Sequence, residues 1–189
     1  RLQAVAAELS PCLVHVLPFD VTDNLATHEA VRSIQTVAGG IDIVFFNAGG
    51  SEHNASDGLD VQSIVAQMEQ NYFSIVYGVN AVLPLLRLSS APHIIGMSSV
   101  AAFLGIPQAE GYCAAKAAAR IFLEAVRAKL WTQKIPITII CPGFIKTPLV
   151  AKNDFYMPFL MSPQRAARII ARAVAKKKCN CIFPSRMKW

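Results

Sequence analysis

The sequence predicts an α/β protein built on a doubly wound parallel sheet, with three layers of helix, sheet and helix. Two observations support this fold class. Short apolar runs of strand length alternate along the chain with longer segments of helical periodicity, a pattern typical of parallel sheets covered by helices on both faces. In addition, 53% of the 189 residues are hydrophobic and only 16% are charged, so most of the chain should lie in buried structure.

The first elements follow from propensity and capping signals. Residues 1–9 resemble the end of a helix, and residues 12–21 are rich in the β-branched and aromatic residues that favour a strand. Asp23 or Asn24 is predicted to cap a helix over residues 25–38. A Gly-Gly pair then ends this helix.

The middle of the chain continues the alternation. Residues 41–46 form a continuous apolar run with two aromatics, typical of a strand buried on both faces. A polar loop over residues 47–58 follows. Residues 59–87 predict a long amphipathic helix that stops near Pro84 or just beyond it, because proline disrupts a helix interior. Residues 93–99 predict the next buried strand.

The last elements repeat the same order. Residues 110–133 predict a helix, residues 136–141 a strand, and residues 163–178 a further helix that a Ser-Pro pair begins. Residues 179–183 predict a short final strand. No repeat, linker or low-complexity tract interrupts the pattern, so residues 1–189 are interpreted as one domain.

Charge and cysteine content narrow the function classes. The net charge is +6, and a basic cluster near the C-terminal end has the spacing of a solvated helix face, which is favoured over a nucleic-acid or lipid patch. No aromatic residues interleave with it, so nucleic acid is not an expected partner. No apolar run is long enough to suggest a membrane span.

Five cysteines without a C-x-x-C pair indicate a reducing compartment, and the cytoplasm is predicted. The four histidines lack metal-ligand spacing, so no metal site is expected.

Small and polar residues follow the predicted strands. In parallel sheets, ligands bind beyond the carboxyl ends of the strands. Turn formation alone explains a glycine or asparagine at any one of these positions. Four such strand ends together favour a cleft. The residues are Asp20, Asn47, Gly49, Gly50, Ser98, Ser99, Pro142, Gly143 and Thr147.

Tyr112 and Lys116 stand four residues apart in an alanine-rich segment and should share one helix face. Taken alone, they would read as an ordinary surface pair. They occur, however, after N-A-G at 47–49, an Asn at 71 and M-S-S at 97–99, and before P-G-F-I-K-T at 142–147. With these motifs in this order, the chain resembles the short-chain dehydrogenase/reductase family, among its small oxidoreductase-type members, over nearly its whole length. The resemblance implies a Rossmann-like fold.

One feature departs from the family pattern. Family members open with a strand and a glycine-rich T-G-x-x-x-G-x-G turn, which places a dinucleotide pyrophosphate on a helix N-terminus. The chain has no such turn. The first strand-helix-strand unit, about 30 residues, is therefore expected to be absent from this sequence. The choice between NAD and NADP is set in that unit, and NADP is slightly favoured.

The resemblance implies an oxidoreductase that transfers a hydride between a nicotinamide dinucleotide and a carbonyl or secondary alcohol. Tyr112 would be the general acid and base, with a nearby Lys116 ammonium favouring its phenolate. Ser99 would hold the substrate oxygen, with Ser98 as the alternative. Lys116 would also bind the nicotinamide ribose. Asn71 would hold a water that carries protons to Lys116, although a polar helix residue bonded to backbone is the other interpretation.

Cofactor contacts are carried over by position in the same way. Asp20 would accept a hydrogen bond from the adenine amino group, although a turn residue is the other interpretation. The remaining contacts are Val21 at the adenine, Asn47, Ala48 and Gly49 at the adenine ribose, and Pro142, Gly143, Ile145 and Thr147 around the nicotinamide amide.

Substrate and assembly are less constrained. The apolar residues 100–111 and 149–161 predict a pocket for a small, neutral, hydrophobic substrate, and residues 148–161 are expected to close over the cofactor as a lid. A homodimer or homotetramer is predicted on the helices at 59–87 and 110–133, through apolar residues at Ile75, Val79, Ile121, Phe122 and Ala125. A non-catalytic dinucleotide-binding or assembly protein of the same fold is the alternative.

Overall fold

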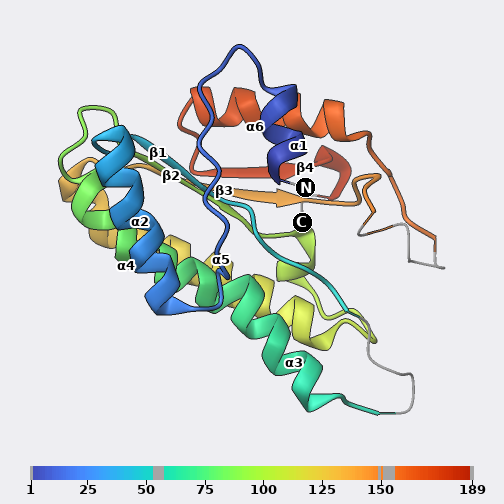
Figure 1. The fold of residues 1–189 in the computed structure, drawn as a ribbon. Helices are drawn as coiled ribbons and strands as arrows, with labels where there is room; N and C mark the ends of the chain where they lie inside the picture. Colours follow the sequence, from blue (N-terminus) through green and yellow to red (C-terminus); the bar gives the residue numbers. More distant parts are fainter. Residues whose placement is uncertain (1, 53–57, 149, 151–155, 188–189) are drawn as a thin grey trace.

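The structure is a computed structural model that describes residues 2–52, 58–148, 150 and 156–187. Four parallel strands form one sheet in the order β1-β2-β3-β4, with adjacent strands also consecutive in the chain (Figure 1). The register sets Phe46 beside Gly96, Met97 beside Ile140 and Pro142 beside Phe183. All four strands therefore end at the same edge of the sheet. Their bounds are Ile43–Phe46 (β1), His93–Met97 (β2), Ile137–Pro142 (β3) and Asn180–Phe183 (β4).

Helices cover both faces of this sheet, which confirms the three-layer α/β fold. Figure 1 shows α4 and α5 on one face, with α2 beside α4, and α6 on the other. No helix among the described residues has both the length and the apolar character needed to cross a membrane. The helices are α1 (Leu2–Glu8), α2 (Asn24–Ala38), α3 (Val61–Met68), α4 (Ser74–Leu86), α5 (Glu110–Leu130) and α6 (Pro163–Ala175).

The core consists of two apolar clusters, one on each face of the sheet. Consecutive residues of a strand point to opposite faces, so Ile94 packs with α4 and α5 whereas Ile95 packs with α6. Ile139 and Ile140 of β3 divide in the same way. Both faces of β2 and β3 are thus buried, as their continuous apolar sequences predict.

The prediction of a strand at residues 12–21 was wrong. These residues run without a strand partner, and Leu13 is largely exposed. The register pairs β1 with β2 along one edge, and no described strand hydrogen-bonds to its other edge. Residues with high β-propensity form a strand only where a neighbouring backbone supplies the hydrogen bonds, and this segment has no such neighbour among the described residues.

The same open edge changes the burial of β1. The sequence indicated a strand buried on both faces, but Ile43 is 58% exposed and Phe45 is 43% exposed. Only Val44 and Phe46 point into the cluster shared with α4 and α5. The prediction was wrong because one face of β1 has no helix packed on it in the described part of the chain.

Helix boundaries differ from the predictions in two places. The helix predicted at 59–87 is α3 and α4, joined by a π-helical turn, η1 (Glu69–Phe73); α4 continues past Pro84 to end at Leu86. The helix predicted to reach residue 178 ends at Ala175, and Lys177 has a left-handed φ of 47°. Capping follows the sequence signals, since the Asp23 carboxylate accepts from Ala26 N–H at the start of α2. Ser162 caps α6 through Arg165 N–H.

The predicted assembly residues divide between core and surface. Ile75 and Val79 are almost fully buried against β2 and α5. The prediction that they contribute to an interface was therefore wrong. They lie on the face of α4 that covers the sheet. Ile121 and Ala125 lie exposed on α5, and Phe122 is partly buried.

Candidate active site

The N-terminal turns of α5 carry Tyr112 and Lys116 on one face. The alanines between and after them favour the helix and add no bulk. The Lys116 amine lies 5.7 Å from the centre of the Tyr112 ring. It is only 5% exposed and donates to the Met97 carbonyl at 3.2 Å. The carbonyl end of β2 therefore holds the lysine beneath the tyrosine.

Two serines follow β2 and have different contacts. The Ser98 hydroxyl donates to the Lys116 carbonyl at 2.9 Å, so it fastens α5 to the end of β2. Ser99 turns the chain into a short 3₁₀ helix, and its side-chain oxygen accepts from Ala101 N–H at 3.1 Å. Ser99 also lies near enough to the Tyr112 hydroxyl to lower the pKa of the tyrosine. The structure thus brings Ser99, rather than Ser98, to the tyrosine.

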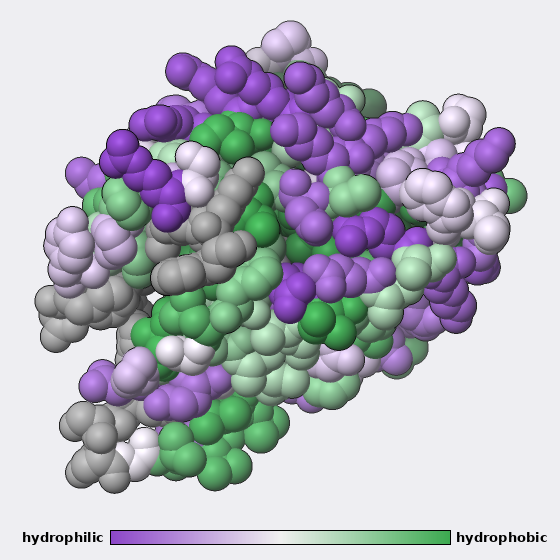
Figure 2. Space-filling view, turned by 180° about the vertical axis from the view of Figure 1, so that it is seen from behind, coloured by the Kyte–Doolittle hydropathy of each residue, from purple (hydrophilic) through white to green (hydrophobic). Residues whose placement is uncertain are grey.

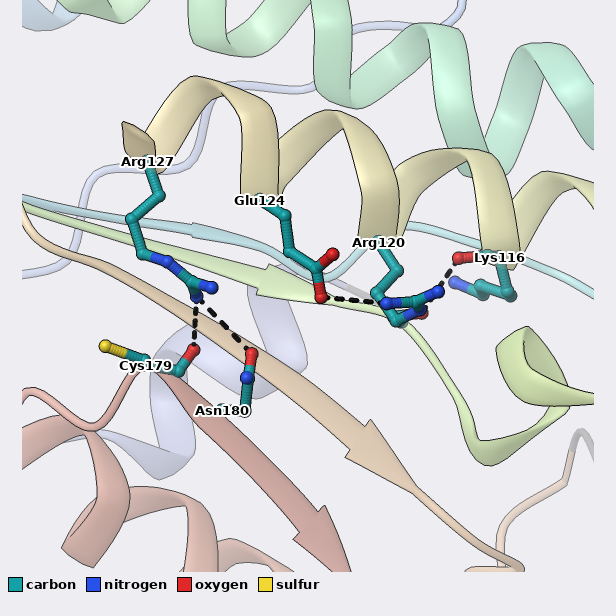
Figure 3. Close-up of polar contacts among 7 residues, drawn as sticks. Lys116, Arg120, Glu124, Arg127, Cys179 and Asn180 are labelled. Carbon is teal, nitrogen blue, oxygen red and sulfur yellow. Dashed lines mark hydrogen bonds and ion pairs between the residues drawn. The ribbon is translucent and has the colours of Figure 1, made fainter. Parts of the chain in front are cut away.

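The far end of α5 is anchored to the opposite edge of the sheet. Figure 3 shows Arg120, Glu124 and Arg127 pointing from α5 toward the strands, in line with Lys116. Arg120 pairs with Glu124 at 2.8 Å, and Arg127 donates to the Cys179 carbonyl at 2.9 Å. The Arg120–Glu124 pair lies within α5, so it is the Arg127 contact that ties the helix carrying Tyr112 and Lys116 to the sheet.

Asn71 lies in the π-helical turn between α3 and α4, and such turns are frequent at functional sites. Its side-chain amide donates to the Gln67 carbonyl at 2.9 Å and to the Gly50 carbonyl at 3.0 Å. Its side-chain oxygen is buried and has no partner. A buried polar atom without a hydrogen bond is costly, so this oxygen is set up for a ligand or a water.

Gly49 lies against both Asn71 and Lys116. A Cβ atom at this position would stand 2.6 Å from the Asn71 side-chain oxygen and 3.1 Å from the Lys116 amine. The two polar atoms therefore approach the same point beside the backbone of the loop after β1. Only glycine leaves room for this approach.

One cavity of about 290 Å³ at the carboxyl edge of the sheet collects most of the predicted site residues. The loop after β3 forms one wall, where Gly143 N–H donates to the Phe183 carbonyl at 2.7 Å. Ile145 bridges to Met161 and so ties this loop to the start of α6. The lining residues predicted from sequence are Asn47, Gly49, Asn71, Ser99, Tyr112, Lys116, Pro142, Gly143, Ile145 and Thr147.

Three predicted adenine-side residues lie outside this cavity. Val21 and Ala48 line a separate apolar cavity beside β1, which Asn47 also reaches. Asp20 is exposed, and its carboxylate accepts from the backbone N–H and the hydroxyl of Thr22 at 2.9 and 2.7 Å. These hydrogen bonds lower the pKa of Asp20. Asp20 is a turn residue in this structure, and its contact with adenine stays a prediction.

Part of the predicted substrate pocket and lid, residues 149 and 151–155, lies outside the described residues. Cys113 packs with Ala101 and Ala109 in a small apolar cluster that Tyr112 also contacts, so the expectation that it points away from the tyrosine was wrong.

Burial controls the ionisation of the two central groups. It lowers the pKa of Lys116 to about 8, because the charged amine loses hydration. It also raises the pKa of Tyr112, and the nearby Ser99 side chain offsets part of this rise. The Lys116 charge was expected to lower the pKa of Tyr112, but burial has the larger effect and raises it. At neutral pH the pair is therefore a neutral phenol beside a protonated amine.

Some of the site contacts had no sequence signal. The Met97 carbonyl that accepts from Lys116 belongs to a backbone that any residue would supply. The contact of Gly50 with Gln70, whose side-chain oxygen would lie 2.5 Å from a Cβ on Gly50, needs the folded loop to be seen. Gln67 is different: it precedes Asn71 by one helical turn, so the helical period could have indicated that they touch.

The parallel sheet and the polar groups at its carboxyl edge define an α/β protein whose cavity lies where such sheets bind their ligands. The chain belongs to the short chain dehydrogenase family, whose sequence pattern matches residues 1–155. This confirms the family expected from the motifs.

Related sequences come from bacteria, fungi and vertebrates. An uncharacterized oxidoreductase of Myxococcus xanthus is 33% identical over 97% of this chain, which spans 74% of that protein. Oxidoreductase BOA17 of Botryotinia fuckeliana is 35% identical over 81% of the chain, which spans 56% of that protein. Dehydrogenase/reductase SDR family member 7B of Xenopus tropicalis is 33% identical over 87% of the chain, which spans 57% of it.

Solved structures agree on the fold. A short-chain dehydrogenase from Streptomyces avermitilis superposes with a TM-score of 0.84 at 20% identity, over 98% of this chain and 75% of that one. A short chain dehydrogenase from Burkholderia cenocepacia, in complex with NADP, gives a TM-score of 0.79 at 23% identity, over 90% of this chain and 69% of that one.

Proposed function

We propose that this chain is an oxidoreductase that uses a nicotinamide dinucleotide to interconvert a carbonyl and a secondary alcohol. The observation that carries the proposal is the gathering of Asn71, Ser99, Tyr112 and Lys116 around one cavity at the carboxyl edge of the sheet. Membership of the short chain dehydrogenase family and the NADP bound by the Burkholderia relative support it.

The cavity residues fit the reactive half of such a cofactor. The unpartnered Asn71 oxygen and the space kept open by Gly49 mark a place for polar atoms that the chain does not supply. About 290 Å³ is at the low end of the ~300–1,000 Å³ typical of ligand pockets. This volume suits a nicotinamide riboside end with a small carbonyl. Lys116 would hold the ribose hydroxyls, and the loop at 142–147 would hold the carboxamide. When bound, the dinucleotide supplies or accepts the hydride.

Proton transfer falls to the residues of the chain. Tyr112 keeps its proton at neutral pH, since its ordinary pKa is already 10 and burial raises it further, so it can donate to the oxygen of a carbonyl under reduction. In oxidation it takes the proton back. Ser99 accepts from Ala101 N–H, so its own hydroxyl proton can be donated either to the Tyr112 oxygen or to the developing alkoxide. The Lys116 ammonium offsets negative charge on the phenolate. Asn71 would hold a water that returns protons to Lys116.

The finer parts of the proposal come from the same residues. The apolar residues of η2 (Val100–Phe103), beside Ser99, favour a neutral, hydrophobic substrate. NADP is preferred to NAD, and a cytoplasmic, single-domain protein is proposed. The alternative is a non-catalytic dinucleotide-binding or assembly protein of this fold. It predicts nucleotide binding without turnover.

The test is the oxidation of NADPH and NADH by the full chain with a panel of small neutral ketones and aldehydes. Tyr112→Phe should lower kcat by about 10²- to 10⁴-fold, the usual contribution of a general acid. The dissociation constant of the nucleotide should be nearly unchanged. Tyr77→Phe, which alters a tyrosine of α4 that stacks on Phe73, is the matched control and should keep wild-type kcat. Turnover that survives in Tyr112→Phe would refute the assigned role, and nucleotide binding with no turnover in wild type would favour the non-catalytic alternative.

A further inference from the structure

The excess of positive over negative charge in this protein comes from its last segment. Residues 155–189 contain eight lysines and arginines and no aspartate or glutamate. The preceding 154 residues carry ten basic against twelve acidic residues, so they are slightly negative. The net charge of +6 therefore arises entirely from the C-terminal segment.

The structure places most of this charge on the outer face of α6 and in the lysine turn that follows it. The inner face of the helix packs on the sheet through Ala166, Ile170 and Ala173. Figure 2 shows hydrophilic residues over the top of the molecule, where Figure 1 places α6. No ion pair found among the described residues reaches this surface, since those present join Arg32 with Glu29 and Arg120 with Glu124. We call the exposed residues Arg165, Arg168, Arg172, Lys176, Lys177 and Lys178 the basic face.

Exposed apolar side chains lie at the start of the same helix. Tyr156 is 87% exposed, Phe159 46% and Leu160 45%, and we call these three the apolar tip. Phe159 has a φ of 57°, in the left-handed region that bulky residues avoid. Its ring lies 5.7 Å from the Arg186 guanidinium and not in a core cluster. The backbone thus displays a phenyl ring at the surface beside a cation.

We infer that the basic face and the apolar tip together bind the surface of a bilayer that contains anionic lipids. An unneutralised cationic face is attracted to such a surface, and adjacent aromatic and aliphatic side chains can insert at the headgroup level. Nucleic acid would match the charge, but no aromatic side chain stands among the cations of α6 for bases to stack on, since Tyr156 and Phe159 precede the helix. Met161, directly after the tip, bridges to Ile145 of the cleft wall, so the contact would lie beside the mouth of the cleft. The inference does not depend on the proposed oxidoreductase function.

The test is co-sedimentation of the full chain with vesicles of phosphatidylcholine, with and without phosphatidylserine. Wild type should bind the mixed vesicles, should not bind pure phosphatidylcholine, and should dissociate at high salt. The triple variant R165Q/R168Q/R172Q should bind at least about tenfold more weakly, given that each basic residue near the surface contributes to the attraction. Glutamine keeps the helix propensity of arginine, and circular dichroism would verify the fold.

Two further variants separate this surface from net charge. The control R32Q/K129Q/K134Q removes the same charge from exposed positions on other elements and should bind as wild type does. Phe159→Asn, which tolerates a left-handed backbone, should also weaken binding by removing the ring. Equal losses in the two triple variants would overturn the inference. Equal binding to both kinds of vesicle, or tighter binding to a DNA duplex than to the mixed vesicles at the same salt, would overturn it too.

Discussion

Gly49 is where the loop after β1 comes closest to the polar side chains of the cleft. Gly49→Ala would place a methyl group 2.6 Å from the Asn71 oxygen and 3.1 Å from the Lys116 amine. Both groups would have to move, and small displacements of catalytic groups cost up to about 10²-fold in rate. We expect kcat to fall by about tenfold or more, with little change in melting temperature.

The control for this substitution is Gly40→Ala, because a Cβ at Gly40 meets no atom within 4 Å and its φ is not left-handed. Steady-state kinetics of the two variants should therefore differ. Equal activity of Gly49→Ala and Gly40→Ala would contradict the close approach seen in the structure.

Lys116 makes the stability of the protein depend on pH. Its pKa is about 8 in the folded chain and near 10.5 when unfolded. Between these values the unfolded state binds more protons, so the free energy of unfolding rises with pH. From pH 8 to pH 10 the gain should be about 2 to 3 kcal/mol. It would be absent in Lys116→Met, which keeps the length of the side chain without the charge.

Chemical denaturation of wild type and Lys116→Met at both pH values measures this gain as a difference, in which other titrating groups cancel. Tyr112 acts in the opposite direction only above its ordinary pKa of 10, since burial raises that value. A wild-type protein that gains no stability over the variant between pH 8 and pH 10 would show that the amine is hydrated.

For single residues, the sequence predicted correctly which side chains lie together when both belong to the same helix. Tyr112 and Lys116 share a face because of the helical period, and the structure keeps them on it. The partners of Ser98 and Asn71 depend on how α5 and the turn η1 meet the strand ends, over separations of about twenty residues. Local patterns carry no information about such contacts.

Among the secondary-structure elements, too, the sequence predicted some correctly and failed for others. The strands that are covered on both faces, β2 and β3, were found within two residues of their ends, because burial leaves a continuous apolar run. The segment at 12–21 has an equally apolar sequence but no strand beside it. Whether such a run becomes a strand is decided by pairing between distant parts of the chain, which periodicity does not encode.

Gly96 sets the distance between β2 and α5. A Cβ atom at Gly96 would overlap the Leu123 side chain, which is fully buried in the core. Gly96→Ala should therefore destabilise the fold by about 1 to 3 kcal/mol through overpacking. Leu123→Ala alone should cost about 2 to 5 kcal/mol through the cavity that it leaves.

The double variant G96A/L123A tests whether these two residues oppose one another. The added methyl fills part of the space that leucine vacated, so the double variant should lose less stability than the sum of the single changes. Urea denaturation of the four proteins provides the comparison. Strict additivity would mean that α5 does not rest on the strand at Gly96.

The molecule as a whole has an apolar surface on the side away from α6. Val65 of α3, Phe73 of η1 and Ile121 of α5 are exposed, and α3 and η1 both contact α5. Tyr72 joins these elements, because its ring lies 4.9 Å from Phe73 and 6.0 Å from Phe122 of α5. An apolar surface of this kind on two neighbouring helices is suited to a partner that presents the same surface.

We therefore predict that the chain forms a homodimer, or a homotetramer built from such dimers, through α3, η1 and α5, since two-fold pairing is the commonest closed symmetry. Ile121→Lys places a charge on this surface and should give monomers. Leu88→Lys changes a leucine beyond the end of α4 that is 81% exposed, against 52% for Ile121, and should leave the assembly intact. Size-exclusion chromatography with light scattering measures the mass of each protein. A wild-type mass of one chain at micromolar concentration would refute the prediction, as would a loss of assembly in Leu88→Lys with none in Ile121→Lys.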